Sequence, residues 1–491
     1  MRPALVTCLF LLGTGLASAA DWPQFRGPNS TGVSAEARLP DEWSAAKNIA
    51  WKAKIPGYGW SAPIVWGDKL FVTSAVSDKQ KKPASGFGGP GGFGPPGGAP
   101  PGGPPGGGFG PGFGPGRGFG GGKPPDEVYR FEIYCLSAAD GKVLWKQTAA
   151  EQKPTIPTNP TNTYATETPV TDGERIYAYF GMTGVFCYDL AGKFVWKAEL
   201  GSYPMAMGNG TGSSPALDGG RLFIQCDNEQ KSFLVALDAK TGKELWRTSR
   251  TERTGWSTPL VWKNKSRTEI VCVGSPSVRS YDPATGKQLW EMSGVNGQIK
   301  ASPVATEEML YVGSGGGPGG MGMGGGGFGR PGGGRPGGDG GGFGGGARPF
   351  FAIRPGGSGN ITLKDGEKSN DYVFWKLPQA GPATPSPLIY DGYLFILEDR
   401  GGMVSCYDPK TGKQLYKERI SGARGFTSSP WACDGKVFCL DDSGTTHVLK
   451  AGPEFKVLGK NKIDEMCWSS PAVTGDSLIL RTVENVYCIR K

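Results

Sequence analysis

The stretch LDAKTGKELW, residues 237–246, decides the fold. It combines the end of an apolar strand, an Asp-x-x-Thr-Gly turn and a second strand that closes on tryptophan. The aspartate can hydrogen-bond the turn backbone, and the glycine supplies the positive φ that such a turn requires. Close copies occur as YDPATGKQLW (281–290) and YDPKTGKQLY (407–416). A hairpin that recurs in this way predicts a repeat protein.

Weaker copies extend the series in both directions. AADGKVLW ends at Trp145 and YDLAGKFVW ends at Trp196, each with a shortened turn. NDYVFWK keeps only the closing Trp375, and AGPEFKVL (451–458) has lost the motif. We expect the closing tryptophans to pack between neighbouring units, because one large ring fills the wedge between two twisted sheets.

A second hairpin precedes each of these motifs. It places Ser or Thr and Pro before an apolar strand and a turn, as in SSPALDGGRLFI, and its eight copies begin at residues 61, 167, 213, 257, 301, 385, 428 and 469. Four short strands in about 45 residues, without helical periodicity, are typical of a propeller blade. The sequence therefore predicts an all-β fold, a single eight-bladed β-propeller of four-stranded antiparallel blades.

The last blade lacks its fourth strand. SSPAVTGDSLILRTVENVYCIRK (469–491) reaches the C-terminus after three strands, whereas NIAWKAKI (48–55) is a closing strand without a hairpin before it. We predict that 48–55 completes the last blade, with Trp51 in the closing position. Sharing one blade between the two ends would remove the open sheet edge.

These motifs resemble the PQQ-like (pyrrolo-quinoline quinone) repeat propellers over nearly all of 48–491. The segment DWPQFRGPNSTGVS (21–34) also resembles the lead-in of bacterial exported proteins with such repeats. The family includes quinoprotein alcohol dehydrogenases and BamB-like proteins of outer-membrane assembly. The resemblance implies two classes of function. The chain would be a non-catalytic protein-binding scaffold of the cell envelope, or a PQQ-dependent oxidoreductase. Such an oxidoreductase could be active, or degenerate through loss of its catalytic residues.

The chain divides into a leader, a lead-in and the propeller. Residues 1–20 have one arginine, a short apolar core and a small-residue end, as in a secretory signal peptide. Residues 21–47 form the lead-in and 48–491 the propeller. We expect an exported monomer of the periplasm or cell envelope with an envelope protein or peptide as its partner. No segment is long and apolar enough to predict a transmembrane span.

Two low-complexity insertions, 84–125 and 315–348, account for much of the Gly (84) and Pro (41) content. Both interrupt a blade between its second and third strands, in blades one and five, which are opposite in an eight-membered ring. Their composition cannot bury enough apolar surface to order itself. They are either tolerated loop expansions or flexible, weakly cationic tethers for envelope partners.

Charge and cysteine usage exclude further classes. The net charge of +9 is not gathered in a basic helix or arm, which argues against a nucleic-acid partner. Four of the ten cysteines (Cys135, Cys187, Cys406 and Cys488) recur at the same phase of the repeat, so we expect structural thiols. Cys433 and Cys439 are the nearest pair for a disulfide.

The sequence offers no catalytic constellation. His447 is the only histidine, which argues against Ser-His-Asp, Cys-His and multi-histidine metal sites. A quinone dehydrogenase of the resembled family should show adjacent cysteines, a catalytic aspartate and a calcium site with glutamate and asparagine. No Cys-Cys pair occurs, and Glu167 alone cannot hold calcium. We predict no catalytic residue, metal or cofactor, with PQQ and calcium only under the oxidoreductase alternative.

One set of positions predicts a binding site. The residues three before each repeat proline should ring the axial funnel: Trp60, Thr166, Gly212, Trp256, Lys300, Thr384, Thr427 and Trp468. The candidate funnel-mouth residues are Trp60, Glu167, Trp256, Lys300, Arg424 and Trp468. They would suit a peptide or a small ligand, and binding of a polysaccharide is a further alternative. Packing between blades is the alternative role of the tryptophans.

Overall fold

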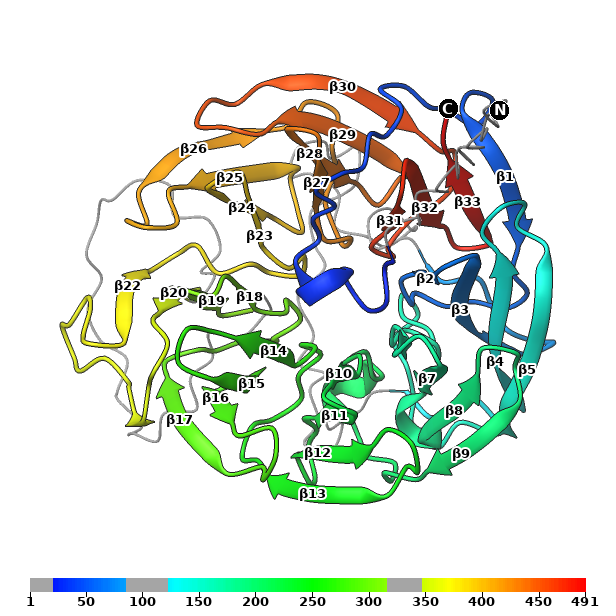
Figure 1. The fold of residues 1–491 in the computed structure, drawn as a ribbon, viewed down its shortest axis with the longest axis horizontal. Helices are drawn as coiled ribbons and strands as arrows, with labels where there is room; N and C mark the ends of the chain where they lie inside the picture. The colour runs from blue at the N-terminus through cyan, green and yellow to red at the C-terminus, as the bar shows by residue number, and fades with distance from the viewer. Residues whose placement is uncertain (1–20, 85–121, 316–346) are drawn as a thin grey trace, which may run out of the picture.

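A computed structural model describes residues 21–84, 122–315 and 347–491 of the 491-residue chain. Eight sheets stand as blades around a central axis, and the colours in Figure 1 follow the chain once around the ring. The eight-bladed propeller predicted from the sequence is confirmed. The predicted signal peptide (1–20) and most of both insertions lie outside the described residues, so these predictions stay predictions.

Each blade is numbered from its innermost strand outward (Figure 1). Blades one and two contain β2 (Ile64–Trp66), β3 (Lys69–Val76), β4 (Tyr129–Ser137), β5 (Val143–Gln152), β6 (Val170–Thr171), β7 (Arg175–Tyr179), β8 (Val185–Asp189) and β9 (Phe194–Ala198). Blades three and four contain β10 (Ala216–Asp218), β11 (Arg221–Cys226), β12 (Phe233–Asp238), β13 (Glu244–Ser249), β14 (Leu260–Lys263), β15 (Thr268–Val273), β16 (Ser277–Tyr281) and β17 (Gln288–Ser293).

Blades five and six contain β18 (Val304–Ala305), β19 (Leu310–Gly313), β20 (Phe350–Ile353), β22 (Val373–Leu377), β23 (Leu388–Tyr390), β24 (Tyr393–Leu397), β25 (Met403–Tyr407) and β26 (Gln414–Arg419). Blades seven and eight contain β27 (Trp431–Cys433), β28 (Lys436–Leu440), β29 (Thr445–Lys450), β30 (Val457–Lys462), β31 (Ala472–Thr474), β32 (Ser477–Arg481), β33 (Asn485–Ile489) and β1 (Ile49–Lys54). The described helices are the 3-10 turns η1 (Pro28–Ser30), η2 (Gly181–Thr183) and η3 (Ala206–Gly208).

Burial falls from the middle of a blade to its outer edge. In β3 the six residues between Lys69 and Val76 are all buried, whereas β5 at the rim is buried at none of its residues. The second and third strands therefore carry the apolar runs, because both of their faces pack against neighbouring blades. The core is a series of layers between blades rather than one central cluster.

Four closing tryptophans pack on the turn of the next blade in the same way. The indole Nε1 of Trp145 donates to the carbonyl of Leu190 at 3.0 Å, and its ring lies on Gly192. The same pairing joins Trp196 with Gly242, Trp246 with Gly286 and Trp375 with Gly412. All four glycines have positive φ, between 70° and 85°. The repeated glycine thus serves both the turn and the neighbouring tryptophan, since a Cβ there would lie only 2.4–3.1 Å from the ring.

Trp290 of blade four departs from this pattern. Its Nε1 donates to Glu269 of its own blade at 2.7 Å, and Gly357 lies beside its ring. Blade five lacks the Asp-x-x-Thr-Gly turn. Its third and fourth strands are joined instead by an excursion whose strand β21 (Gly359–Asn360) pairs in parallel with β17 as a fifth strand.

The ring closes through the two ends of the propeller, as predicted. β1 pairs antiparallel with β33, and Trp51 lies opposite Cys488. The Trp51 indole donates to the carbonyl of Ala138 in blade one at 3.0 Å. Trp145, Trp196, Trp246 and Trp375 make this contact with their next blade, so the seam between blades eight and one uses the same joint.

The recurrent cysteines face the closing aromatic residues. The pairs across the two outermost strands are Cys135–Trp145, Cys187–Trp196, Cys406–Tyr416 and Cys488–Trp51. A small apolar side chain leaves room there for the ring. The nine described cysteines are all free thiols, so a Cys433–Cys439 disulfide is not formed. In that hairpin Trp431 pairs with Phe438, which sets Cys433 and Cys439 three positions out of register.

The lead-in is part of the propeller rather than a tail. Trp22 is 1% exposed and pairs with Val65 of blade one, and Thr171 of blade two donates its N–H to the carbonyl of Pro23. The chain crosses the axis through η1, drawn in blue in the middle of the ring in Figure 1. It then pairs through Val33 with Ala432 of blade seven. Residues 22–34 therefore form a chord across the axial channel.

The described ends of the insertions are anchored to the blades. Ala84 donates its N–H to the carbonyl of Pro160 at 2.9 Å, and Arg348 forms an ion pair with Glu398 at 2.9 Å. Gly315 donates its N–H to the carbonyl of Asn296. The insertions delimited from the sequence as 84–125 and 315–348 thus include terminal residues that belong to the packed fold.

Candidate functional site

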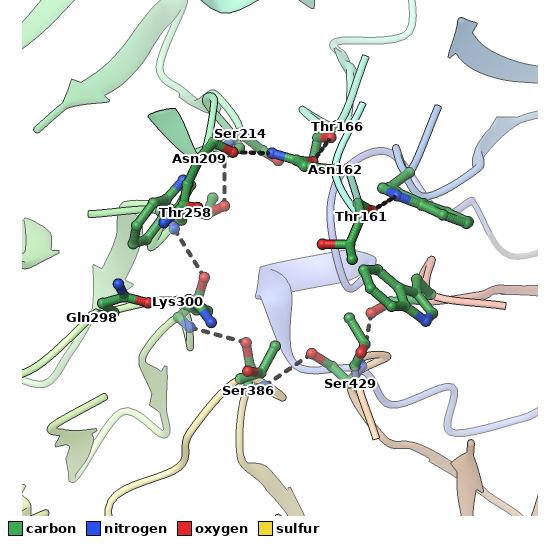
Figure 2. A pocket seen from close by; sticks show the side chains of 18 of the residues that line it. Thr161, Asn162, Thr166, Asn209, Ser214, Thr258, Gln298, Lys300, Ser386 and Ser429 are labelled. Atoms are coloured by element: carbon green, nitrogen blue, oxygen red, sulfur yellow. Dashed lines mark hydrogen bonds between the residues drawn. The ribbon is translucent and has the colours of Figure 1, made fainter. Parts of the chain in front are cut away.

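A ring of hydrogen bonds surrounds the axial channel. The residue before each repeat proline carries a hydroxyl in seven blades, and each hydroxyl oxygen accepts the backbone N–H of the equivalent residue in the preceding blade. The acceptors, at 2.9–3.1 Å, are Thr168, Ser214, Thr258, Ser302, Ser386, Ser429 and Ser470. Figure 2 shows part of this ring around the channel. The recurrence of Ser or Thr before proline is therefore structural, because each hydroxyl satisfies a buried N–H.

Blade one interrupts the ring because Ala62 stands in place of the hydroxyl residue. At this joint Ser469 Oγ donates to the carbonyl of Ser61 at 2.9 Å. The guanidinium of Arg481 donates to that same carbonyl at 3.2 Å and to the carbonyl of Thr73 at 2.6 Å. Burial lowers the pKa of Arg481 to about 9. Side chains of blade eight thus fix the joint that the ring leaves open.

A cavity of about 530 Å³ opens along the axis above this ring. It is lined by all eight residues that stand three before a repeat proline: Trp60, Thr166, Gly212, Trp256, Lys300, Thr384, Thr427 and Trp468. Phe25 of the lead-in lines it too, and the chord to which Phe25 belongs crosses the axis at the level of Val65. The cavity is a funnel with a floor, which we call the axial funnel.

Aromatic side chains form two facing sides of the axial funnel. Trp60 and Trp468, in neighbouring blades one and eight, are stacked with ring centroids 5.4 Å apart. Trp256 belongs to blade four, directly opposite blade eight in the ring. The Trp60 indole is held by the carbonyl of Thr161, and the Trp256 indole by that of Gly210. A ligand in the axial funnel would lie between these two aromatic surfaces.

A polar side lies on the loops that enter blades two and three. Asn162 donates to the carbonyls of Asn209 and Thr211, and accepts from the hydroxyl of Thr166 at 2.6 Å. Asn159 donates to Asn209 Oδ1 at 3.1 Å. These bonds hold the loops in place before any ligand arrives, and Figure 2 shows Asn162, Asn209 and Thr166 together on this side.

The charged lining residues are Lys300 of blade five and Asp399 and Arg400 of blade six. Lys300 is half-buried, and burial lowers the pKa of its ammonium group while attraction to Asp399 opposes that shift. Arg400 already interacts within the protein. Of the six candidate funnel-mouth residues, Trp60, Trp256, Lys300 and Trp468 come together in the axial funnel.

Glu167 and Arg424 do not line the axial funnel. Glu167 follows Thr166, and successive side chains of an extended chain point to opposite sides, so Glu167 is turned into the wall. It is 1% exposed, and burial raises its pKa to about 7. Arg424 lies on the loop before β27 and is absent from the lining. The sequence pattern placed both residues by nearness along the chain rather than by side-chain direction.

Several lining residues escaped the sequence analysis because they lie on loops outside the repeat. They include Phe25, Asn159, Asn209, Met207 and Asp399. Met207 is 46% exposed and has a positive φ of 54°, which residues other than glycine rarely adopt. No sequence pattern signals that strained backbone. The single histidine, His447, is buried against Asp441 at 3.2 Å and lies outside the lining.

The lining does not fit a quinone held with calcium. No cysteine lines the axial funnel, and Asp399 is its only carboxylate among the described residues. Calcium requires six to eight oxygen ligands with several carboxylates among them. Elsewhere in the described ranges no group of three or more His, Cys, Asp or Glu side chains is placed to hold a metal ion.

Comparison with known proteins supports the fold and the repeat. Residues 128–255 match the family model described as outer membrane protein assembly factor BamB, which confirms the resemblance to PQQ-like repeat propellers. No curated protein matches the chain. In the described part of the chain, no helix could cross a membrane.

The solved structures that the chain resembles share its architecture at low identity. A europium-containing methanol dehydrogenase superposes with a TM-score of 0.54 at 11% identity, covering 95% of this chain and 90% of that one. Quinohemoprotein alcohol dehydrogenase from Comamonas testosteroni gives 0.53 at 11% identity, with 96% and 80% covered. BamB from Moraxella catarrhalis gives 0.48 at 12% identity, with 73% and 88% covered. The two dehydrogenase likenesses show the propeller fold and nothing finer.

Proposed function

We propose that this chain, whose residues 128–255 match a PQQ-like repeat family model, is an exported, non-catalytic propeller that captures a peptide segment of a cell-envelope partner. The observation that supports it is the axial funnel, with three tryptophans on two facing sides and polar groups between them. Clefts of 300–1,000 Å³ that combine apolar walls with a few fixed polar groups are typical binding sites. We further propose that the chain acts as a monomer and takes part in outer-membrane assembly.

The chemistry of the lining supports binding over catalysis. Ser and Thr hydroxyls of the ring accept backbone N–H groups, and none lies beside a histidine, since His447 is in the wall of blade seven. Nucleophilic catalysis needs a base within hydrogen-bond reach of the nucleophile. In the described ranges no group of three or more His, Cys, Asp or Glu side chains could hold a catalytic metal ion.

Crosslinking would test the proposed function. A photoreactive residue replaces Met207 at the funnel lip, and a matched variant carries it at Lys240, an exposed turn residue outside the lining. We expect a protein adduct from intact cells for the first variant and none for the second, with the crosslinked peptide identified by mass spectrometry. Equal adducts from both positions, or none from Met207, would contradict capture in the axial funnel.

Reconstitution would test the oxidoreductase alternative. The purified protein is incubated with the quinone and calcium, scanned for absorbance and assayed for dye reduction with alcohols. We expect no turnover, because the lining lacks the cysteine pair and carboxylates of such a site. Turnover that depends on the quinone would replace the binding function with a catalytic one.

A further inference from the structure

Several polar groups that face the axial funnel without a partner lie around Trp256. Among the described residues, the Lys300 ammonium forms no hydrogen bond or ion pair, and neither does the side chain of Gln298. Asn209 Nδ2 also donates to no described residue, although Asn209 Oδ1 accepts from Asn159. Figure 2 shows Gln298 and Lys300 next to each other. These groups are available to a ligand.

The charge of this side is positive. Lys300 is a half-buried cation, and the nearest counter-charge, Asp399, attracts it without forming an ion pair. The neighbouring Arg400 repels it. Removing an ammonium group from water without a partner is unfavourable, so a half-buried lysine that faces a cavity favours an anionic group on the ligand.

Apolar side chains also line the axial funnel. Phe25 forms the floor, Met207 the lip, and the tryptophans two of the sides. Primary amides such as Gln298 and Asn209 match peptide groups as both donors and acceptors. An apolar floor, an amide pair and the Lys300 ammonium group together complement an amphipathic chain that carries a single negative charge.

The floor adds a constraint on how a chain can enter. The chord of residues 22–34 crosses the axis between blade one and blade seven. A polypeptide therefore cannot thread through the propeller, and only a chain end or a tight bend can reach the level of Lys300. The C-terminal end of a peptide is the chain end that carries an anion.

We propose that the axial funnel recognises the free C-terminal carboxylate of a peptide, with Lys300 as the carboxylate-binding residue and the last side chain directed at the floor around Phe25. This inference rests on the proposed function. It narrows the partner to a chain whose C-terminus is exposed and whose last residue is apolar.

Matched peptides test the inference on the full-length protein. The probes are the hexapeptide Gly-Ser-Thr-Ala-Val-Phe with a free carboxylate and the same peptide with a C-terminal amide, and affinity is measured by calorimetry. A hydrogen bond to a charged group contributes about 1.5–3 kcal/mol, so the free acid should bind at least about tenfold tighter. In K300M that preference should disappear while the affinity of the amide stays unchanged, and in K300R it should persist. K240M is the control, because Lys240 lies on an exposed turn outside the lining.

The outcomes separate this inference from the proposed function. If the acid and the amide bind equally to the wild-type protein, and Trp256→Ala weakens both, then peptide capture stands and carboxylate recognition is wrong. If neither peptide binds and a uronic-acid disaccharide does, both the inference and peptide capture are overturned in favour of a saccharide. Melting curves of K300M establish that its binding data refer to folded protein.

Discussion

The ring of Trp51 packs directly on Gly141, so closely that a Cβ at that position would lie 2.5 Å from its Cε3 atom. Trp51 belongs to the first strand of the chain and Gly141 to the turn of blade one. The same contact joins four other closing tryptophans to the blade that follows, with Trp290 as the exception. The seam of the propeller is thus held by a copy of the joint used around the ring.

Replacing Trp51 with alanine should lower the free energy of unfolding as much as truncating a buried core side chain does. Trp51 is 8% exposed, and Trp→Ala in a packed site lowers the free energy of unfolding by about 3–5 kcal/mol. Chemical denaturation of Trp51→Ala measures this loss. Leu144→Ala, at a rim position that is 50% exposed, serves as the control and should change stability little. A Trp51→Ala protein that melts with the wild type would contradict the closure.

Each hydrogen bond of the hydroxyl ring should contribute separately to the free energy of unfolding. In Ser386→Ala the N–H of Ser302 loses its acceptor in a buried site, which should lower the free energy of unfolding by about 1–3 kcal/mol. Ser266→Ala removes an exposed hydroxyl with no described partner and should be nearly neutral. Urea titration compares the two. Equal midpoints would show that the ring hydrogen bonds add nothing measurable.

Two classes of tryptophan should respond differently to truncation. Trp246→Ala removes a half-buried ring that packs on Gly286 of the next blade and should destabilise the protein. Trp256→Ala removes a half-buried lining side chain and should weaken peptide binding while changing stability less. Melting temperature and peptide affinity are measured for both variants. Identical behaviour of the two would remove the distinction between packing and binding tryptophans.

Glu167 should make the propeller less stable as the pH rises. Burial raises its pKa to about 7, above the ordinary 4.5 at which it ionises in the unfolded chain. Between these two pKa values the unfolded state loses its proton first, so the free energy of unfolding falls by about 1.4 kcal/mol for each rise of one in pH. Above about pH 7 both states are ionised and the loss is complete.

Glu167→Gln should remove this part of the pH dependence. Denaturation midpoints measured at about pH 5 and about pH 7 should therefore differ less in Glu167→Gln than in the wild type. Glu174→Gln, at an exposed carboxylate, should keep the wild-type difference. The burial argument is wrong if both variants retain it.

The insertions and the blade-five excursion should differ in their tolerance to excision. Joining Ala84 to Gly122 with a short Gly/Ser linker should leave the unfolding transition intact, because loop-closure entropy changes by only about 0.6 kcal/mol per doubling of length. Replacing 355–371 in the same way removes β21 and Ile361, which is 2% exposed, and should lower stability markedly. Loss of cooperativity in the first variant would mean that 85–121 is packed.

Much of the fold could be predicted because the same sequence motifs recur in several blades. The turn glycine, the closing tryptophan and the Ser/Thr-Pro pair each recur, and most of these recurrences correspond to a contact between neighbouring blades. The seam could be predicted because a missing strand and a surplus strand must meet. The joint at Trp290 could not, since the excursion that replaces the usual turn has no repeat to compare with.

The candidate site could be predicted only as far as the repeat reaches. Counting back from each proline located Trp60, Trp256, Lys300 and Trp468 in the lining. The prediction that Glu167 lines the funnel mouth was wrong because residue spacing alone does not show which side of an extended chain faces the axis. Phe25 and Met207 were missed because they lie on segments that occur once, and their place depends on tertiary contacts.

The chord across the axis changes how the ring should lose its structure. Repeat proteins in which each unit contacts only its neighbours can unfold unit by unit. Here residues 22–34 also tie Val65 of blade one to Ala432 of blade seven, and Arg26 donates to the carbonyl of Pro387 ahead of blade six. Blades that are not adjacent are therefore linked through the chord, and blades one, six and seven cannot detach without breaking one of its contacts. We expect the propeller to unfold as one cooperative unit, unlike an open array of the same repeats.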